Sequence, residues 1–289
     1  VTTSLLLLNC KSENKKQDFS TLTKNYFNDK NELDPLAATQ NGQNEFNDKL
    51  QFEMTDSYRK LQTAFFDKYQ TALQGIAIED LKEEEKNSYE IIKWEIEIGK
   101  ELLNQPTNLI PLHQFGGTHL TMGQFAGGTS AQPFKTEKDY TNFLERMDKY
   151  AVWIDSAMVY MKKGIDKGVV LPRALTLKLI PQFSEMATPK LEDNLFYSSI
   201  KLIPVSFPEG IKEDLTKKYT ETINTKLIPR YKKMADFLTK EYLPASRKTS
   251  GIGSLTFGKD LYKIYVKQWT TTEMTPEEIH ELGLQEVAR

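Results

Sequence analysis

Residues 143–161 read FLERMDKYAVWIDSAMVYM and hold the most regular apolar pattern in the chain. Apolar side chains recur there every three or four residues, the spacing that brings them onto one face of an α-helix. They are Phe143, Met147, Tyr150, Ile154, Met158 and Met161. Aromatic and methionine side chains in such a stripe usually form part of a core and seldom bind a cofactor. We therefore expect a long core helix that ends near Gly164 and Gly168.

Helical spacing of apolar residues also occurs outside this stretch. It predicts helices over residues 46–73, 78–103, 172–183, 188–200 and 208–243. Pro229 lies inside the last of these and should bend it, because proline lacks the backbone donor and crowds the preceding turn. Residues 112–132 are rich in glycine and predict a loop.

Residues 261–272 predict a strand, because aromatic and β-branched side chains fall there into two alternating sets. Tyr262, Ile264 and Val266 would lie on one side of it, opposite Tyr265 and Trp269. We therefore expect a mainly α fold, an elongated array of many helices with a small β element near residues 261–272.

The end of the chain predicts one more amphipathic helix. Thr275 can cap it, Pro276 suits its first turn, and Glu278 completes a capping box. No glycine, asparagine or proline closes it before Arg289. We expect residues 46–289 to be a helical domain that is truncated at its C-terminal end.

The start of the chain resembles the end of a bacterial lipoprotein signal peptide, because residues 5–10 read LLLLNC and contain the only cysteine. The resemblance implies a lipid on Cys10, with residues 1–10 as signal peptide and residues 11–45 as a polar tether and first helix. Neither Lys11 nor Ser12, the two residues after Cys10, is an aspartate, which favours the outer membrane of a Gram-negative cell envelope. The alternative is a buried structural cysteine near an N-terminal strand.

The composition excludes one class of partner. The chain of 289 residues is 39% hydrophobic and 27% charged, with a net charge of -2. Nucleic-acid binding needs clustered basic residues on a positive domain, so no nucleic-acid partner is expected. A single cysteine also excludes an internal disulfide.

Histidine, the most frequent zinc ligand, is scarce. His113 and His119 lie in the glycine-rich segment and His280 lies in the last helix, so a split metal site is conceivable. The motif at 280–284 reads HELGL and lacks the second histidine of a zinc helix. We therefore predict no catalytic, cofactor-binding or metal-binding residue in this chain.

Several blocks resemble the Domain of Unknown Function 885 family, a group of bacterial and often lipidated proteins. The similar blocks are residues 168–173, 227–231, 237–238, 242–244, 262–272, 275–284 and 286–287. The resemblance implies a mainly α fold related to gluzincin zinc metallopeptidases. In that family the zinc-binding segment, His-Glu-x-x-x-Gly-His-His, lies downstream of these blocks.

No residue of this chain matches that segment, so the resemblance implies zinc, zinc-activated water and a peptide substrate only for the full-length protein. This chain would form a wall of the substrate cleft and lid-like helices. Candidates for lining the cleft are the glycine-rich residues 115–128, with His113, His119, Tyr262 and His280.

Our leading hypothesis is the N-terminal part of a lipid-anchored protein that resembles zinc metallopeptidases and is inactive as this chain alone. The first alternative is an envelope lipoprotein that binds peptides or glycans without catalysis. The second is a structural envelope protein.

Overall fold

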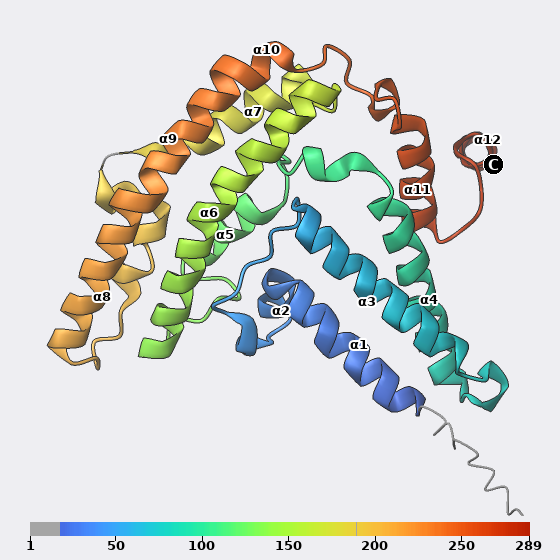
Figure 1. Ribbon diagram of the computed structural model, residues 1–289, viewed down its shortest axis with the longest axis horizontal. Coiled ribbons are helices and arrows are strands. Elements are labelled where there is room, and N and C mark those ends of the chain that lie inside the picture. The colour runs from blue at the N-terminus through green and yellow to red at the C-terminus, as the bar shows by residue number, and fades with distance from the viewer. Residues whose placement is uncertain (1–17, 189) are drawn as a thin grey trace, which may run out of the picture.

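The computed structural model describes residues 18–188 and 190–289, and most of this part of the chain is helical (Figure 1). The α-helices are α1 (Phe19–Leu33), α2 (Pro35–Gln40), α3 (Asp56–Gln74), α4 (Glu83–Leu103), α5 (Thr118–Ala126), α6 (Glu137–Lys167), α7 (Arg173–Ser184), α8 (Glu209–Thr222), α9 (Ile228–Phe237), α10 (Leu243–Ala245), α11 (Gly258–Thr270) and α12 (Pro276–Ala288). No β-strand occurs in the described ranges, and the expected mainly α fold is confirmed.

Two groups of helices form an arch (Figure 1). We call α1, α3 and α4 the N-terminal limb, and α6 to α10 the central limb. Each limb has its own apolar core, because their buried side chains form two separate clusters. The core of the N-terminal limb consists of Phe19, Leu22, Tyr26, Phe65, Tyr69, Leu73, Tyr89, Ile92 and Ile96. The larger core surrounds α6 and also includes side chains of α5 and α7.

The predicted central helix is confirmed as α6. Thr136 and Asp139 form a capping box at its start, and Gly168 ends it with a φ of 69°, a left-handed conformation that suits glycine. The six side chains of the predicted stripe are at most 4% exposed. The helix continues past Gly164, where a Cβ would lie 2.6 Å from the Val169 carbonyl oxygen. Glycine there permits close backbone contact and does not end the helix.

The predicted helix over residues 208–243 is a continuous helical run from α8 to α10 that contains two π-helical segments. These are Ile223–Leu227 and Leu238–Tyr242, and a proline follows two residues after each one. The wider π turns accommodate Pro229 and Pro244, which cannot donate to a regular helical ladder.

The prediction of a β element near residues 261–272 is wrong, because most of these residues belong to α11. Leu261 and Ile264 are buried three residues apart, as on one helix face, whereas Tyr262 and Trp269 are 49% and 82% exposed. Lys267 Nζ lies 3.3 Å from Glu101 Oε1, so α11 lies against α4. The buried residues of this segment therefore follow the spacing of a helix face and not that of a strand.

Other boundaries also differ from the sequence prediction. The first two predicted helices begin later, with α3 at Asp56 and α4 at Glu83. Instead of a helix over residues 188–200, the described residues form three short 3₁₀ turns, Leu191–Asp193, Leu195–Tyr197 and Ile200–Leu202. The expected glycine-rich loop contains α5.

The proposed tether is helical from Phe19 onward, and Cys10 lies outside the described residues. The last predicted helix is confirmed as α12, including its capping box between Thr275 and Glu278. None of the described helices is long and apolar enough to cross a membrane.

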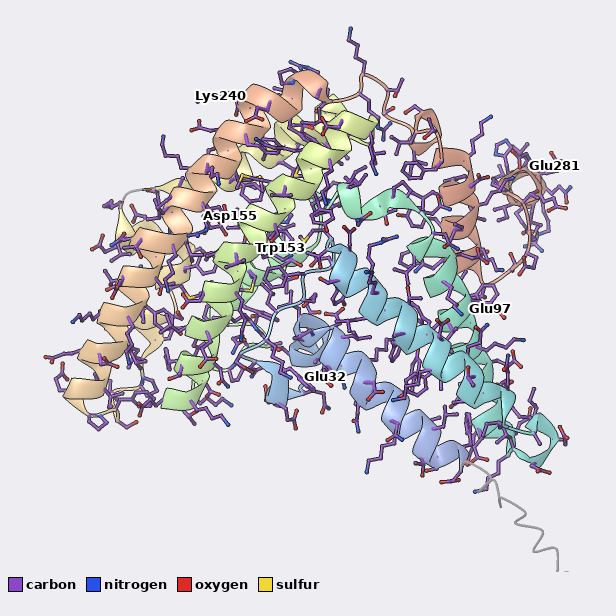
Figure 2. The ribbon with its side chains drawn as sticks, viewed as in Figure 1. Glu32, Glu97, Trp153, Asp155, Lys240 and Glu281 are labelled. Carbon is purple, nitrogen blue, oxygen red and sulfur yellow. The ribbon has the colours of Figure 1, made fainter. Side chains whose placement is uncertain are left out.

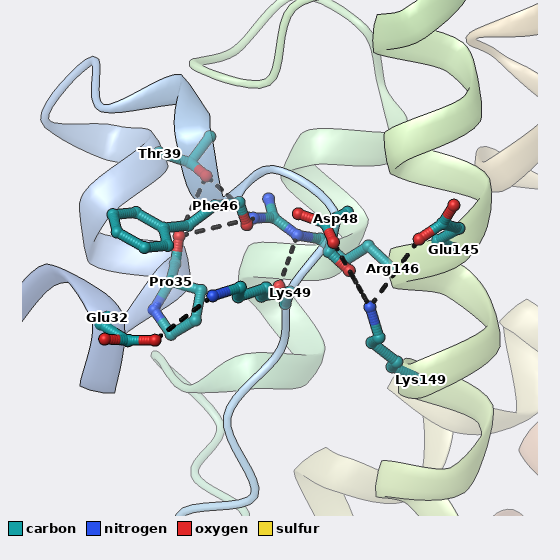
Figure 3. A network of polar contacts seen from close by, with 9 residues as sticks. All are labelled: Glu32, Pro35, Thr39, Phe46, Asp48, Lys49, Glu145, Arg146 and Lys149. Atoms are coloured by element: carbon teal, nitrogen blue, oxygen red, sulfur yellow. Dashed lines mark hydrogen bonds and ion pairs between the residues drawn. The ribbon is translucent and has the colours of Figure 1, made fainter.

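Arg146 of α6 binds the segment between α1 and α3 (Figure 3). Its side chain is fully buried and donates hydrogen bonds to the carbonyl oxygens of Lys49 and Phe46, at 2.9 and 2.6 Å. Thr39 Oγ1 and Gln132 Oε1 accept two more. Burial lowers the pKa of Arg146 to about 10, and the Asp48 carboxylate acts against this shift. The guanidinium therefore stays charged at neutral pH and satisfies backbone acceptors.

Candidate functional site

A pocket of about 550 Å³ surrounds His119 in the central part of the fold. Helix α5 supplies His119 and Gly123, and the end of α7 supplies Gln182 with Glu185 just beyond it. Tyr231 of α9 closes one side. The pocket is large enough for a small ligand and combines an apolar wall with a few polar groups, the usual composition of binding sites.

The hydrogen bonds of His119 fix its tautomer. Gln182 Nε2 donates to the Gln114 carbonyl oxygen at 3.1 Å, which turns Gln182 Oε1 toward His119 Nε2 at 3.2 Å. Since that oxygen only accepts, Nε2 carries the hydrogen and Nδ1 has a free lone pair. Nδ1 is buried and has no hydrogen-bond partner. The imidazole is therefore a neutral ring with one unused acceptor.

The surroundings of His119 keep it uncharged at neutral pH. The ring is 6% exposed and stacks on Phe183, with 5.3 Å between ring centroids. Burial lowers the pKa of His119 to about 4, and His113 adds to this shift while the Gln182 contact opposes it. His119 therefore suits acceptance of a hydrogen bond better than electrostatic attraction of an anion.

Acid should destabilise the protein through His119. Its folded pKa of about 4 lies below the ordinary value of 6.5. The unfolded chain therefore binds more protons between these values, and the stability present near pH 7 is lost as pH falls. Between pH 7 and pH 4.5, the unfolding free energy of the wild type should fall by roughly 2–3 kcal/mol more than that of the His119→Gln variant, which has no imidazole at this position. Urea unfolding at both pH values measures this.

The His280→Gln variant, measured in parallel, controls for the loss of one imidazole at an exposed position. Equal pH dependence in the wild type and in His119→Gln would contradict a neutral, buried His119.

The other predicted cleft residues are dispersed. His113 lies at an exposed turn before α5, where its Nδ1 accepts from the Phe115 backbone N–H at 3.2 Å. Tyr262 and His280 lie exposed on α11 and α12, away from α5 (Figure 1). Of the glycine-rich residues, Gly123 and Gly127 line the pocket of His119. None of His113, Tyr262 and His280 therefore lines the pocket of His119.

The described residues do not fit a zinc ion. Within 18–188 and 190–289, no three His, Cys, Asp or Glu side chains come close enough together to hold a metal. Nε2 of His119 is already engaged with Gln182, and His280 is on a separate helix.

Two larger grooves, which the sequence did not indicate, flank the N-terminal limb. The aromatic groove, about 780 Å³, lies among α1, α3, α4 and α11. Its aromatic lining consists of Tyr26, Tyr58, Phe65, Phe66, Trp94 and Trp269. The inter-limb groove, about 990 Å³, lies between α3 and α6. Residues far apart in sequence form both grooves, so no local motif could reveal them.

Comparison with known proteins identifies a family and a shared fold. The family described as "Bacterial protein of unknown function (DUF885)" matches residues 35–289. The chain is also similar to the crystal structure of "the putative lipoprotein from Colwellia psychrerythraea", with a TM-score of 0.78 and 18% sequence identity. That match covers 95% of this chain and 49% of the Colwellia chain, so this chain spans about half of its length. No protein with a curated description matches.

Proposed function

Because the chain belongs to the DUF885 family of bacterial proteins, we propose that it is the substrate-binding part of an envelope zinc peptidase. The observation that supports this most is the family match over residues 35–289, together with the two sizeable grooves beside the N-terminal limb. The match covers 49% of the Colwellia chain, and we propose that the catalytic part of the complete protein corresponds to the other half. Zinc and the residues that would hold it belong to that other part.

The complete protein provides the direct test. We expect about one zinc per chain, as in mononuclear catalytic zinc sites, and hydrolysis of unstructured peptides that stops on chelation. Residues 1–289 alone should hold no stoichiometric zinc and cleave no peptide. A complete protein without zinc or hydrolysis would exclude the peptidase proposal.

A second candidate function is binding without catalysis, as an envelope lipoprotein that captures peptides or glycans. The aromatic groove favours it, because exposed rings such as that of Trp269, 82% exposed, contribute strongly to ligand contacts. The metal content of the complete protein separates the two functions, since stoichiometric zinc is expected only for the peptidase.

We also propose that a lipid on Cys10 anchors the protein in the cell envelope. The Colwellia protein, described as a putative lipoprotein, supports this through the shared fold. Several acyl chains bind a membrane far more stably than one. Cys10→Ser in the complete protein should move it out of the membrane fraction, whereas Ser12→Ala should not.

Cell fractionation and a density gradient measure the effect of Cys10→Ser, and the gradient distinguishes the outer from the inner membrane. We expect the wild type in the outer membrane. An unchanged distribution of Cys10→Ser would contradict the anchor.

A further inference from the structure

The aromatic groove combines apolar walls with ring faces that a ligand can reach. Trp269 of α11 is 82% exposed and Ile91 of α4 is 59% exposed, and both line this groove. Tyr58 and Phe66 of α3 line it as well. Because the face of an aromatic ring carries a negative partial charge, a ligand in this groove meets both apolar contacts and surfaces that attract a cation.

The lining of the aromatic groove contains more carboxylates than cations. Asp34, Glu90 and Glu95 supply three carboxylates, whereas Lys30 supplies the one ammonium group of the lining within the described residues. Lys30 Nζ lies 2.7 Å from Glu95 Oε2, so these two charges compensate each other. Glu90 has only a loose contact, because Lys93 Nζ lies 3.9 Å from its Oε2. The lining therefore has a net negative charge.

Asp34 is the carboxylate of the groove that has no ammonium partner. Its Oδ1 accepts from the Ala37 backbone N–H at 3.0 Å and from Gln51 Nε2 at 2.9 Å. Within residues 18–188 and 190–289, its Oδ2 has no partner and is not one of the buried unpartnered atoms, so a ligand can reach it. Asp34 is half-buried, where solvent screens a charge less than at an exposed position. Its carboxylate therefore attracts a cation into the groove.

Two rings of the groove already have an ammonium group of the chain over them. Lys267 Nζ lies 5.1 Å from the centroid of the Trp94 ring, and Lys30 Nζ lies 5.8 Å from that of the Tyr26 ring. The other four rings, including that of Trp269, have no such neighbour in the part of the chain that the structure describes. The exposed face of Trp269 is therefore available to a cationic ligand.

The surroundings favour an organic cation over a metal ion or a strongly hydrated ammonium group. In the described ranges, no three His, Cys, Asp or Glu side chains come together to hold a metal. Apolar walls do not replace the water ligands of a hydrated ion. A quaternary ammonium group has its charge covered by carbon, loses little hydration and contacts ring faces directly.

We propose that the aromatic groove binds a small organic cation with a quaternary ammonium group, whose charge is attracted by Asp34 and Glu90 and whose methyl groups contact the ring of Trp269. The volume of about 780 Å³ leaves room for a larger body attached to that group. The inference goes beyond the proposed function, because neither peptide hydrolysis nor a lipid anchor requires such a ligand.

Choline and the neutral alcohol in which carbon replaces its nitrogen test the role of the charge, because the two molecules have nearly the same shape. Isothermal titration calorimetry on the complete protein should show that choline binds at least about tenfold more tightly. With isotope-labelled tryptophan, choline should shift the indole N–H signals of Trp94 and Trp269, which line the groove. The signal of Trp153, which is fully buried elsewhere, should not move.

Two N-cap aspartates give a matched pair of variants. Asp34 caps α2 and lines the groove, whereas Asp18 caps α1 and is not among the lining residues. Asparagine caps a helix about as well as aspartate, so both variants should fold. Asp34→Asn should weaken choline binding about fivefold or more because it removes the charge, and Asp18→Asn should leave it unchanged.

Two exposed aromatic residues of α11 give a second pair, since Trp269 lines the groove and Tyr262 does not. Trp269→Leu should weaken choline binding about threefold or more, and Tyr262→Leu should not change it. Absent choline binding, equal binding of choline and the neutral alcohol, or equal effects within either pair of variants would overturn the proposal. Zinc content and hydrolysis are measured without choline, so those results stand independently.

Discussion

Arg146→Met should destabilise the protein by about 4 kcal/mol or more, because it removes the donors that satisfy several buried acceptors at once. The carbonyl oxygens of Lys49 and Phe46, the Thr39 hydroxyl and the Gln132 amide oxygen all accept from this guanidinium. Methionine preserves much of the side-chain length but donates nothing. The Lys49 carbonyl oxygen and the Gln132 amide oxygen would then lose these donors, whereas the Phe46 carbonyl oxygen still accepts from the Lys49 backbone N–H and the Thr39 hydroxyl still bonds to Asn47.

Urea unfolding measures this effect against a matched substitution. Arg173→Met removes an exposed arginine at the start of α7 and should cost less than about 1 kcal/mol. If Arg146→Met does not fold, Arg146→Lys retains the charge with fewer, differently placed donors, and should give a measurable intermediate loss. Equal costs for the two Arg→Met variants would contradict the role assigned to Arg146.

Trp153→Ala should be nearly as damaging, at about 4 kcal/mol, because it empties a large volume in the core. The side chain is fully buried, where α6 faces the start of α3 (Figure 2). Its Nε1 donates to Glu53 Oε2 at 2.9 Å, and Thr118 Oγ1 donates to the other carboxylate oxygen at 2.8 Å. Burial raises the pKa of Glu53, and these two donors oppose that shift.

Trp269→Ala is the matched control, because the same side chain is removed where it is 82% exposed on α11. It should change the unfolding free energy by less than about 0.5 kcal/mol. Trp153→Phe separates the two contributions of Trp153, since it keeps most of the volume and loses only the bond to Glu53. If Trp153→Ala is as stable as Trp269→Ala, the stability of the core does not depend on Trp153.

Elements with a strong local signal could be predicted from the sequence. The stripe of α6 and the capping box of α12 depend on neighbouring residues, and both are as expected. Helix α5 was missed because glycine disfavours helices by about 1 kcal/mol per residue. Buried Met122 and Phe125 outweigh that preference, and a Cβ at Gly123 would lie 3.4 Å from Leu195 Cδ2.

The candidate site could be predicted only in part. The sequence singled out His119 because histidines are few, but its partner Gln182 lies 63 positions away and gives no local signal. The inter-limb groove is lined by α1, α3, α6 and the segment between α1 and α3, which lie far apart in the sequence. Tyr262 and His280 stay untested as cleft residues, although both are exposed.

Apolar residues recur every four positions in the helical run from α8 to α10, and the π-helical segments explain how they all stay directed at the core. Four residues of a regular α-helix turn through about 400°, so a stripe repeated every four residues drifts by about 40° at each step. Leu215, Tyr219, Ile223, Leu227 and Tyr231 follow that period and are all at most 3% exposed. Each wider turn absorbs one extra residue and rotates the stripe back. Deletion of one residue within Ile223–Leu227 would therefore turn the following side chains, including Met234 and Leu238, away from α6.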